Sequence, residues 1–303
     1  MPRLSVLVPA RNAESTIDRA VRSTLASLDA AAVDAEVLVF DDRSEDATAA
    51  ALDAIGDPRL RVIRSSTATG VTGGLGALLD ASDSDLVARM DADDRVLRPR
   101  FRSQLAAMRP GTDVVFSTVL DWRPERRPAV SPAAPIPIGL AAFPFHLLLT
   151  NPVSHPTMLA RRSALDRVGG YRAVPAEDYD LWLRFAAAGL GVRRLARPGL
   201  LYRVHPAQIT ASTAWRHESW TDQRVAEAFA TLSTQLLGAP FPRLTTLGYT
   251  ADGADIEAQL EAFAGAFRAG ISGLDPLDRL RLRRRLAARL AATRELAAAR
   301  RAP

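Results

Sequence analysis

The first 120 residues alternate short apolar runs with amphipathic segments, and this alternation limits the fold more than any other feature of the chain. The apolar runs, typical of buried strands, are residues 4–8, 36–40, 60–63, 86–90 and 114–119. The segments between them with helical periodicity are residues 15–28, 46–55, 75–81 and 98–108. Strands that alternate with helices at this spacing indicate βαβ units and a mostly parallel sheet.

Polar motifs follow three of the predicted strands. They are ARN at residues 10–12, DDRSED at 41–46 and DADD at 91–94. Ligands of open α/β sheets bind at the carboxyl ends of the strands. We therefore expect the three motifs to line one binding edge.

The DADD motif offers two carboxylates one residue apart, Asp91 and Asp93, at a transition from strand to loop. Such a pair can share a divalent cation that faces a diphosphate, and hard oxygen ligands suit Mg²⁺ or Mn²⁺. The alternative is a solvated acidic turn, which the motif alone does not exclude.

In DDRSED, Asp41 or Asp42 can accept hydrogen bonds from a nucleobase or from ribose hydroxyls. Ser44 is a candidate cap for the next helix, and Glu45 and Asp46 favour the positive end of that helix. Both interpretations can hold together.

The segment AEDYDLWLRFAAAGL at residues 176–190 predicts a helix that begins beside Glu177 and Asp178. A carboxylate next to an apolar stretch can act as a general base. The simpler interpretation is that the acidic residues complement the helix dipole. We expect Trp182, on the apolar face of this helix, to lie in the core.

The remaining chain is less informative. The proline-rich residues 122–139 predict a surface loop, residues 140–205 resume mixed structure with helices near 143–150, 162–168 and 178–189, and the pattern is helical from residue 213 onward. An arginine-rich segment from residue 276 has an apolar stripe consisting of Leu277, Leu280, Leu286, Leu290 and Leu296. This stripe can pack on the catalytic domain or on a second subunit, or it can lie on an anionic membrane surface.

Composition excludes several classes. All 39 basic residues are arginine, so Schiff-base lysines and the P-loop lysine are absent, and the pI near 10.4 is not evidence for nucleic-acid binding. The chain has no cysteine, which suits a reducing compartment. No apolar run reaches the roughly 20 residues of a membrane helix. We expect a soluble cytoplasmic protein, or a peripheral one on the inner face of the membrane.

A glycine-rich segment, TGVTGGLG at residues 69–76, matches a dinucleotide-binding turn. That turn belongs after the first strand of a dehydrogenase, whereas this one follows the third, and the lysine of the dehydrogenase pair is absent. The missing lysine also argues against a sugar nucleotidylyltransferase.

The order of the motifs resembles that of family 2 glycosyltransferases, which are inverting enzymes of the GT-A fold. The motifs are SVLVPARN, DDRSEDAT, VARMDADD, NPVSHPTMLARRSALDRVGGY, AEDYDLWLRFAAAG and YRVH, and they cover residues 3–210. The resemblance implies a Rossmann-like α/β domain over residues 1–210, with a helical C-terminal region over 211–303 for packing, dimerisation or membrane contact.

The resemblance also implies residue roles. Asp178 would be the general base, and Asp91, Asp93 and His205 would hold Mn²⁺ or Mg²⁺. The nucleotide-sugar would contact Pro9, Ala10, Asn12, Asp41, Asp42 and Asp91. His155 and Glu177 would line the sugar or acceptor cavity, although a structural role for His155 is an open alternative.

The expected reaction is transfer of a sugar from a nucleoside-diphosphate sugar, with UDP as the favoured nucleotide, to a hydroxyl acceptor. The acceptor would be a sugar, a lipid-linked sugar or a small molecule, in cell-envelope polysaccharide, glycolipid or natural-product glycosylation. The alternative is a non-catalytic nucleotide-sugar-binding protein on a degenerate GT-A fold. A dead homologue would be expected to have lost Asp91, Asp93 or Asp178, and all three are present.

Overall fold

The structure, a computed structural model, describes residues 3–131, 136–205, 208, 212–250 and 255–300 of the chain. The chain divides into two compact units. The first consists of Met1–Ile138, Val153–Ala173 and Leu190–Pro206, and the second of Gly139–Pro152, Val174–Gly189 and Ala207–Pro303. Two inner segments of the predicted catalytic region, 139–152 and 174–189, thus pack with the C-terminal helices. The functional division at residue 210 remains a prediction.

The first unit is built on an eight-stranded sheet in the order β3-β2-β1-β4-β7-β6-β8-β5. Its strands are β1 Leu4–Ala10, β2 Ala35–Asp41, β3 Leu60–Arg64, β4 Leu86–Arg89, β5 Arg95–Val96, β6 Val114–Trp122, β7 Leu159–Arg161 and β8 Val192–Arg203. Strands β1 to β4 pair in parallel, as do β6 and β8, whereas β7 runs antiparallel to β4 and β6, and β5 to β8. The predicted mostly parallel sheet is confirmed.

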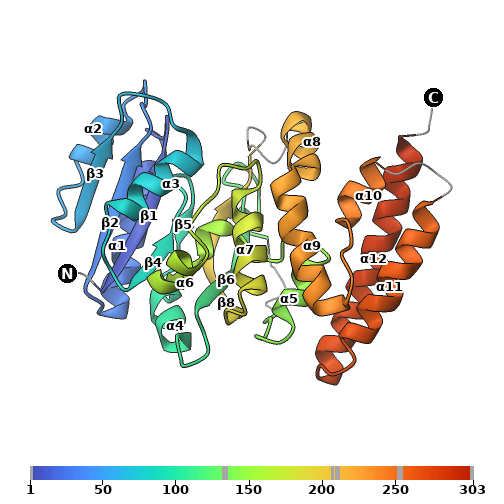
Figure 1. The fold of residues 1–303 in the computed structure, drawn as a ribbon. Helices are drawn as coiled ribbons and strands as arrows, with labels where there is room; N and C mark the ends of the chain where they lie inside the picture. The colour runs from blue at the N-terminus through green and yellow to red at the C-terminus, as the bar shows by residue number, and fades with distance from the viewer. Residues whose placement is uncertain (1–2, 132–135, 206–207, 209–211, 251–254, 301–303) are drawn as a thin grey trace. The chain divides into compact units, whose positions relative to one another are not determined.

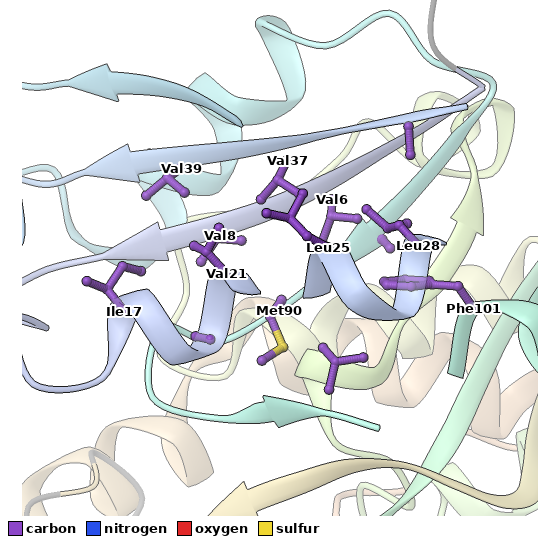
Figure 2. Packing of buried hydrophobic residues seen from close by; sticks show 14 of the residues in the cluster. Val6, Val8, Ile17, Val21, Leu25, Leu28, Val37, Val39, Met90 and Phe101 are labelled. Atoms are coloured by element: carbon purple, nitrogen blue, oxygen red, sulfur yellow. The ribbon is translucent and has the colours of Figure 1, made fainter. Parts of the chain in front are cut away.

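Helices cover both faces of the sheet because β1 and β2 are apolar on both faces. In Figure 2, Val6, Val8, Val37 and Val39 point toward the apolar side of α1 (Ile17–Ala31). The alternate residues of these strands face the opposite side, where α3 (Gly70–Asp80) packs against them. Burial of one such aliphatic side chain contributes about 1.5–3 kcal/mol, so both faces of the two strands stabilise the unit.

The remaining helices of this unit are short. They are α2 Thr48–Asp53, α4 Arg100–Ala107, α6 Arg162–Arg167 and the 3₁₀ turn His155–Thr157. The predicted helices over 46–55, 98–108 and 162–168 are confirmed with trimmed ends. The glycine-rich segment at 69–76 lies almost wholly inside α3, which begins at Gly70, so it is not a phosphate-binding turn.

The second unit is helical. Its helices are α5 Phe143–Leu147, α7 Glu177–Ala187, α8 Thr213–Thr221, α9 Gln223–Leu237, α10 Leu244–Thr250, α11 Ile256–Gly270 and α12 Pro276–Ala299. Figure 1 shows α10, α11 and α12 side by side. The Asp222 carboxylate caps α9 and the Asp275 carboxylate caps α12, since each accepts backbone N–H groups of the first turn. Trp182 of α7 is fully buried, as the sequence predicts.

The apolar stripe of α12 agrees with the prediction at Leu286 and Leu290 and differs from it elsewhere. Its buried residues are Leu282, Leu286, Leu290, Thr293 and Ala297, which follow spacings of three and four. Leu277 and Leu280 are 53% and 46% exposed. The predicted stripe consisted only of leucines. The helical period instead places Thr293 and Ala297 on the buried face and leaves the two leucines of the first turns outside it. No helix in the described part of the chain is long and apolar enough to cross a membrane.

The start of β8 depends on a close backbone approach at Gly191. A Cβ on Gly191 would overlap the carbonyl oxygen of Gly111. We expect Gly191→Ala to lower the free energy of unfolding by about 1–3 kcal/mol, because the backbone has to move. The control is Gly76→Ala inside α3, where an added Cβ would meet nothing within 4 Å. This substitution should raise the free energy of unfolding by roughly 0.5–1 kcal/mol. Urea denaturation of both variants measures the difference, and equal stabilities would contradict it.

Candidate active site

The three polar motifs of the first unit lie at one edge of the sheet, because β1, β2 and β4 run in parallel and end there. In register, Ala10 pairs with Asp41 at the ends of β1 and β2, and Leu7 pairs with Arg89 at the end of β4. The end of β8 reaches the same place, since the backbone N–H of Arg203 donates to Asp94 Oδ1 at 2.7 Å. The edge predicted from the sequence is thus formed.

The loops after β1 and β2 are joined by hydrogen bonds through Asn12. Its backbone N–H donates to the Ser44 hydroxyl at 2.9 Å, and its side-chain oxygen accepts the N–H of Glu45 at 2.9 Å. Asn12 has a φ of 49°, a left-handed conformation that asparagine tolerates better than most residues. The two loops therefore hold each other in one conformation.

Ser44 does not cap the next helix, so that prediction is wrong. Helix α2 begins only at Thr48, and its N-cap residue is Ala47, whose side chain accepts no hydrogen bond. The Asp46 carboxylate accepts the N–H of Thr48 at 2.9 Å instead. The Ser44 hydroxyl is used by the neighbouring loop, which a reading of local sequence does not reveal.

Asp41 and Asp42 are both buried and have structural partners. Asp41 Oδ1 accepts the N–H of Ser44 at 3.0 Å. The two oxygens of Asp42 accept the N–H groups of Thr69 at 2.6 Å and Gly70 at 2.9 Å, at the amino end of α3. Asp42 thus caps α3 across a tertiary contact, and its predicted role toward the nucleotide stays a prediction.

The loop after β4 concentrates negative charge at this edge. Asp91 forms an ion pair with Arg89, and the Asp93 carboxylate lies 3.1 Å from His205 Nε2. Burial raises the pKa of the Asp93 carboxyl, and the negative charge of Asp91 raises it further. Burial also raises the pKa of Asp94 well above its usual range, with Asp91 as the next cause.

Two buried arginines, Arg89 and Arg100, interact with these carboxylates. Arg100 is fully buried, and its guanidinium donates to the carbonyl oxygen of Arg89 at 2.8 Å. Burial lowers the pKa of Arg100, an effect that the nearby negative charge of Asp94 opposes. Arg89, Asp94 and Arg100 are site residues that the sequence reading missed. A charged residue at the end of an apolar strand, as in LVARM, was the available signal for Arg89.

A divalent cation fits this group of residues. In the described residues, no three acidic or histidine side chains stand close enough to hold a metal ion by themselves. Asp93 and His205 supply adjacent oxygen and nitrogen donors, and the crowding with Asp91 is repulsion that a cation would relieve. Magnesium in particular is bound through one or two carboxylates together with substrate phosphates. The donor set therefore suits a cation that a diphosphate helps to hold.

The second unit contains the predicted general base. Asp178 lies at the start of α7, where its Oδ2 accepts a hydrogen bond from the Asn151 amide at 2.8 Å. Its Oδ1 accepts the N–H of Tyr179 at 2.6 Å. Asn151 was also missed; it belongs to the NPVSHPT motif, so its place in a conspicuous motif was the available signal. Glu177 is the first residue of α7 and is half-buried.

His155 belongs to the first unit and is buried. Its Nε2 lies 2.9 Å from the Tyr171 hydroxyl, and the two rings are 5.4 Å apart. The contact supports the alternative of a structural role, because it holds the His155 ring against Tyr171. The predicted role in a sugar or acceptor cavity stays untested.

A family model for glycosyl transferase family 2 matches residues 5–169, more than half of the chain. The chain belongs to glycosyl transferase family 2. This confirms the resemblance seen in the motifs, and the protein is a glycosyltransferase. The alternative of a binding protein on a degenerate fold is set aside.

Curated relatives point the same way. The chain is 24% identical over 216 residues to an Escherichia coli protein, the UDP-Glc:alpha-D-GlcNAc-diphosphoundecaprenol beta-1,3-glucosyltransferase WfaP, covering 70% of this chain and 81% of that one. It is 29% identical to the amylovoran biosynthesis glycosyltransferase AmsE of Erwinia amylovora, covering 43% of this chain and 48% of the relative. The match thus spans most of the first relative but less than half of the second.

Solved structures confirm the fold. The glycosyltransferase resembles S. aureus TarS 1–349 in complex with UDP-GlcNAc, with a TM-score of 0.62, 16% identity and coverage of 99% of this chain and 91% of that one. It also resembles the Pyrobaculum calidifontis mannosyltransferase PcManGT in complex with GDP-Man and Mn²⁺, with a TM-score of 0.54, 18% identity and coverage of 99% and 88%. The predicted GT-A fold with additional C-terminal helices is confirmed.

The capping role of Asp42 can be tested through stability. We expect Asp42→Ala to lower the free energy of unfolding by about 1–2 kcal/mol, because two N–H groups at the start of α3 lose their acceptor. The control Asp83→Ala, an exposed residue of the same unit, should change it by less than about 0.5 kcal/mol. Chemical denaturation of both variants measures the effect. An Asp42→Ala variant with the same free energy of unfolding as the wild type would refute the capping role.

Proposed function

We propose that this glycosyltransferase is an inverting, metal-dependent enzyme that transfers a sugar from a nucleoside-diphosphate sugar to a hydroxyl acceptor in cell-envelope polysaccharide or glycolipid assembly. The observation that carries the proposal is the carboxylate group at the carboxyl end of β4, with His205 beside Asp93. UDP is the favoured nucleotide, because the names of the E. coli relative and of the TarS complex contain UDP-sugars.

The donor would bind at the sheet edge of the first unit. Asp93 and His205 would hold Mn²⁺ or Mg²⁺, with Asp91 beside them facing the ribose and the diphosphate. A bound cation would supply positive charge to the leaving diphosphate, which becomes more negative as the sugar–phosphate bond breaks. The solved structure of PcManGT, a complex with GDP-Man and Mn²⁺, supports this choice of metal.

The nucleoside would lie against the loops after β1 and β2. Pro9 and Ala10 end β1, and the backbone around Asn12 is fixed by its bonds to the second loop. A loop held in one conformation before binding loses less entropy when the ligand binds. Asp41 and Asp42 would contribute by shaping these loops as well as through any free lone pairs of their carboxylates.

Asp178 would act as the general base of the second unit. Hydrogen bonds that it accepts from Asn151 and from Tyr179 help to fix the carboxylate and stabilise its charged form. In that form it can take the proton of the acceptor hydroxyl as the oxygen attacks the anomeric carbon. A single displacement on the face opposite the diphosphate inverts the anomeric configuration.

The acceptor and the location are proposals of the same kind. The name of the E. coli relative contains a diphosphoundecaprenol-linked acceptor, which supports a lipid-linked sugar as the acceptor. Such an acceptor would bring the enzyme to the inner face of the membrane as a peripheral protein. The exposed Leu277 and Leu280 at the arginine-rich start of α12 are a candidate contact for that surface or for a second subunit. We propose no nucleic-acid partner.

The donor site predicts a metal-dependent gain in thermal stability. We expect UDP with Mn²⁺ to raise Tm and a chelator to abolish the rise. At a UDP concentration of a hundred times Kd, binding adds about 2.7 kcal/mol to the free energy of unfolding. Asp93→Ala should abolish it as well, whereas Asp83→Ala should keep it. Thermal melts with UDP, GDP, ADP and CDP identify the base. The absence of a shift with every diphosphate would contradict the donor site.

The proposed role of Asp178 as the base predicts a loss of activity without a loss of donor binding. We expect Asp178→Asn to lower kcat by about 10²- to 10⁴-fold while the Tm rise with UDP and Mn²⁺ is retained, because the base acts on the nucleophile and not on the donor. The rate is measured as UDP release from the UDP-sugar, with water in place of the acceptor. Glu218→Gln, an exposed residue of α8 in the same unit, is the control. A kcat within twofold of the wild type would rule out Asp178 as the base.

A further inference from the structure

The second unit contains a cavity of about 280 Å³ that Asp178 lines. The walls come from the segment after α5 and from α7, α8, α9, α10 and α12, all within this unit. The residues that matter for its chemistry are Asp178, Tyr179, Trp215, Trp220, Arg243 and Arg289. A cavity of this size holds one phosphorylated sugar rather than a whole glycan.

Arg243 is fixed in the wall of the cavity. Its guanidinium donates to the carbonyl oxygen of Ser219 at 2.6 Å and lies over the Tyr179 ring, 4.7 Å from the centroid. Burial lowers the pKa of Arg243; the Tyr179 side chain opposes this effect, and the positive charge of Arg289 adds to it. The two cationic groups are therefore close enough to repel each other.

Arg289 is the less satisfied of the two. Its Nε is buried and has no hydrogen-bond partner among the described residues. In the part of the chain that the structure describes, neither Arg289 nor Arg243 forms an ion pair with a carboxylate, and Asp178 is the sole acidic residue of the cavity wall. A buried donor without a partner and two cations with one shared anion both cost free energy. An anionic ligand would remove both costs.

Two tryptophans complete the wall. The Trp215 indole N–H donates to the carbonyl oxygen of Pro175 at 2.6 Å, and the Trp220 ring packs against the Tyr249 ring at 5.7 Å. Their side chains are thereby held in place beside the two arginines. Indole rings give rigid, amphipathic contact area, which suits the apolar faces of a sugar.

We propose that this cavity binds the acceptor through a phosphate group that the acceptor carries next to its reactive sugar, with Arg243 and Arg289 as the phosphate ligands. Arginine donors match phosphate oxygens in geometry, and charge-assisted bonds are the strong ones. The sugar contacts Trp215 and Trp220, and its hydroxyl is presented to Asp178. The proposal rests on the proposed role of Asp178, and it adds the acceptor class: a phosphorylated sugar, either free or lipid-linked.

The test uses the full chain and its tryptophan fluorescence, because two of the four tryptophans line the cavity. UDP and Mn²⁺ are present at saturation so that the donor site is filled. The probes are glucose, glucose 1-phosphate and farnesyl diphosphate. We expect at least one of the two phosphate-bearing probes to bind tenfold or more tightly than glucose. The preferred probe distinguishes a free sugar phosphate from a lipid-linked one. Equal binding of all three probes would overturn the proposal.

Matched variants locate the binding. Arg289→Gln should raise the Kd of the preferred probe by about tenfold or more, the loss expected for one charge-assisted hydrogen bond. Arg289→Lys, which keeps the charge, should recover part of it. Arg284→Gln, an exposed arginine of the same helix, should bind as the wild type does. Equal losses in Arg284→Gln and Arg289→Gln would overturn the proposal, since a diffuse positive surface would then explain binding.

The failure of this inference can be told apart from the failure of the proposed function. A wild-type protein that gains stability with UDP and Mn²⁺ but does not distinguish glucose 1-phosphate and farnesyl diphosphate from glucose has the donor site and lacks the phosphate site. Thermal melts of Arg289→Gln without ligand check that it is folded. A folded variant that binds the preferred probe as tightly as the wild type does would refute the role of Arg289.

Discussion

The burial of Arg100 beneath the carboxylate-rich loop after β4 is the interaction on which the first unit depends. A buried guanidinium is costly unless its N–H groups and its charge are matched. Here the carbonyl oxygens of Arg89 and Met158 accept its hydrogen bonds, and Asp94 is the negative charge that most favours its charged form. The same arginine therefore joins β4 to the segment before β7 and makes a buried acidic loop tolerable.

The two units carry opposite charge imbalances. At the edge of the sheet, Asp91, Asp93 and Asp94 crowd together, and burial with mutual repulsion raises the pKa values of Asp93 and Asp94. In the cavity of the second unit, two arginines face one carboxylate. Each imbalance lowers the stability of the free protein, and a ligand of opposite charge would relieve it. Unmatched charges of this kind are common at binding sites and rare in a protein core. This contrast supports a cation and diphosphate at the first place and an anionic acceptor at the second.

Much of the first unit could be predicted because its signals are local. The strands are unbroken apolar runs, since parallel strands are buried on both faces, and parallel pairing makes the motifs after β1, β2 and β4 share an edge. The errors arose where one segment's partner lies elsewhere in the chain. Ser44, for example, resembles a helix cap but accepts the N–H of Asn12. The glycine-rich segment, which the sequence itself argues against as a dinucleotide-binding turn, is a helix whose amino end Asp42 caps.

The sequence by itself determined the family, the α/β sheet and the contiguous motifs that contain Asp91, Asp93 and Asp178, because each is encoded in neighbouring residues. Only the tertiary structure decided which arginines matter. Arg243 and Arg289 are two of 39 arginines without a distinguishing local pattern, and Trp215 is likewise inconspicuous. Helices from separate parts of the chain pack around one space, and packing, unlike periodicity, depends on residues far apart in the sequence. The cavity and its unmatched charge exist only once those helices have come together.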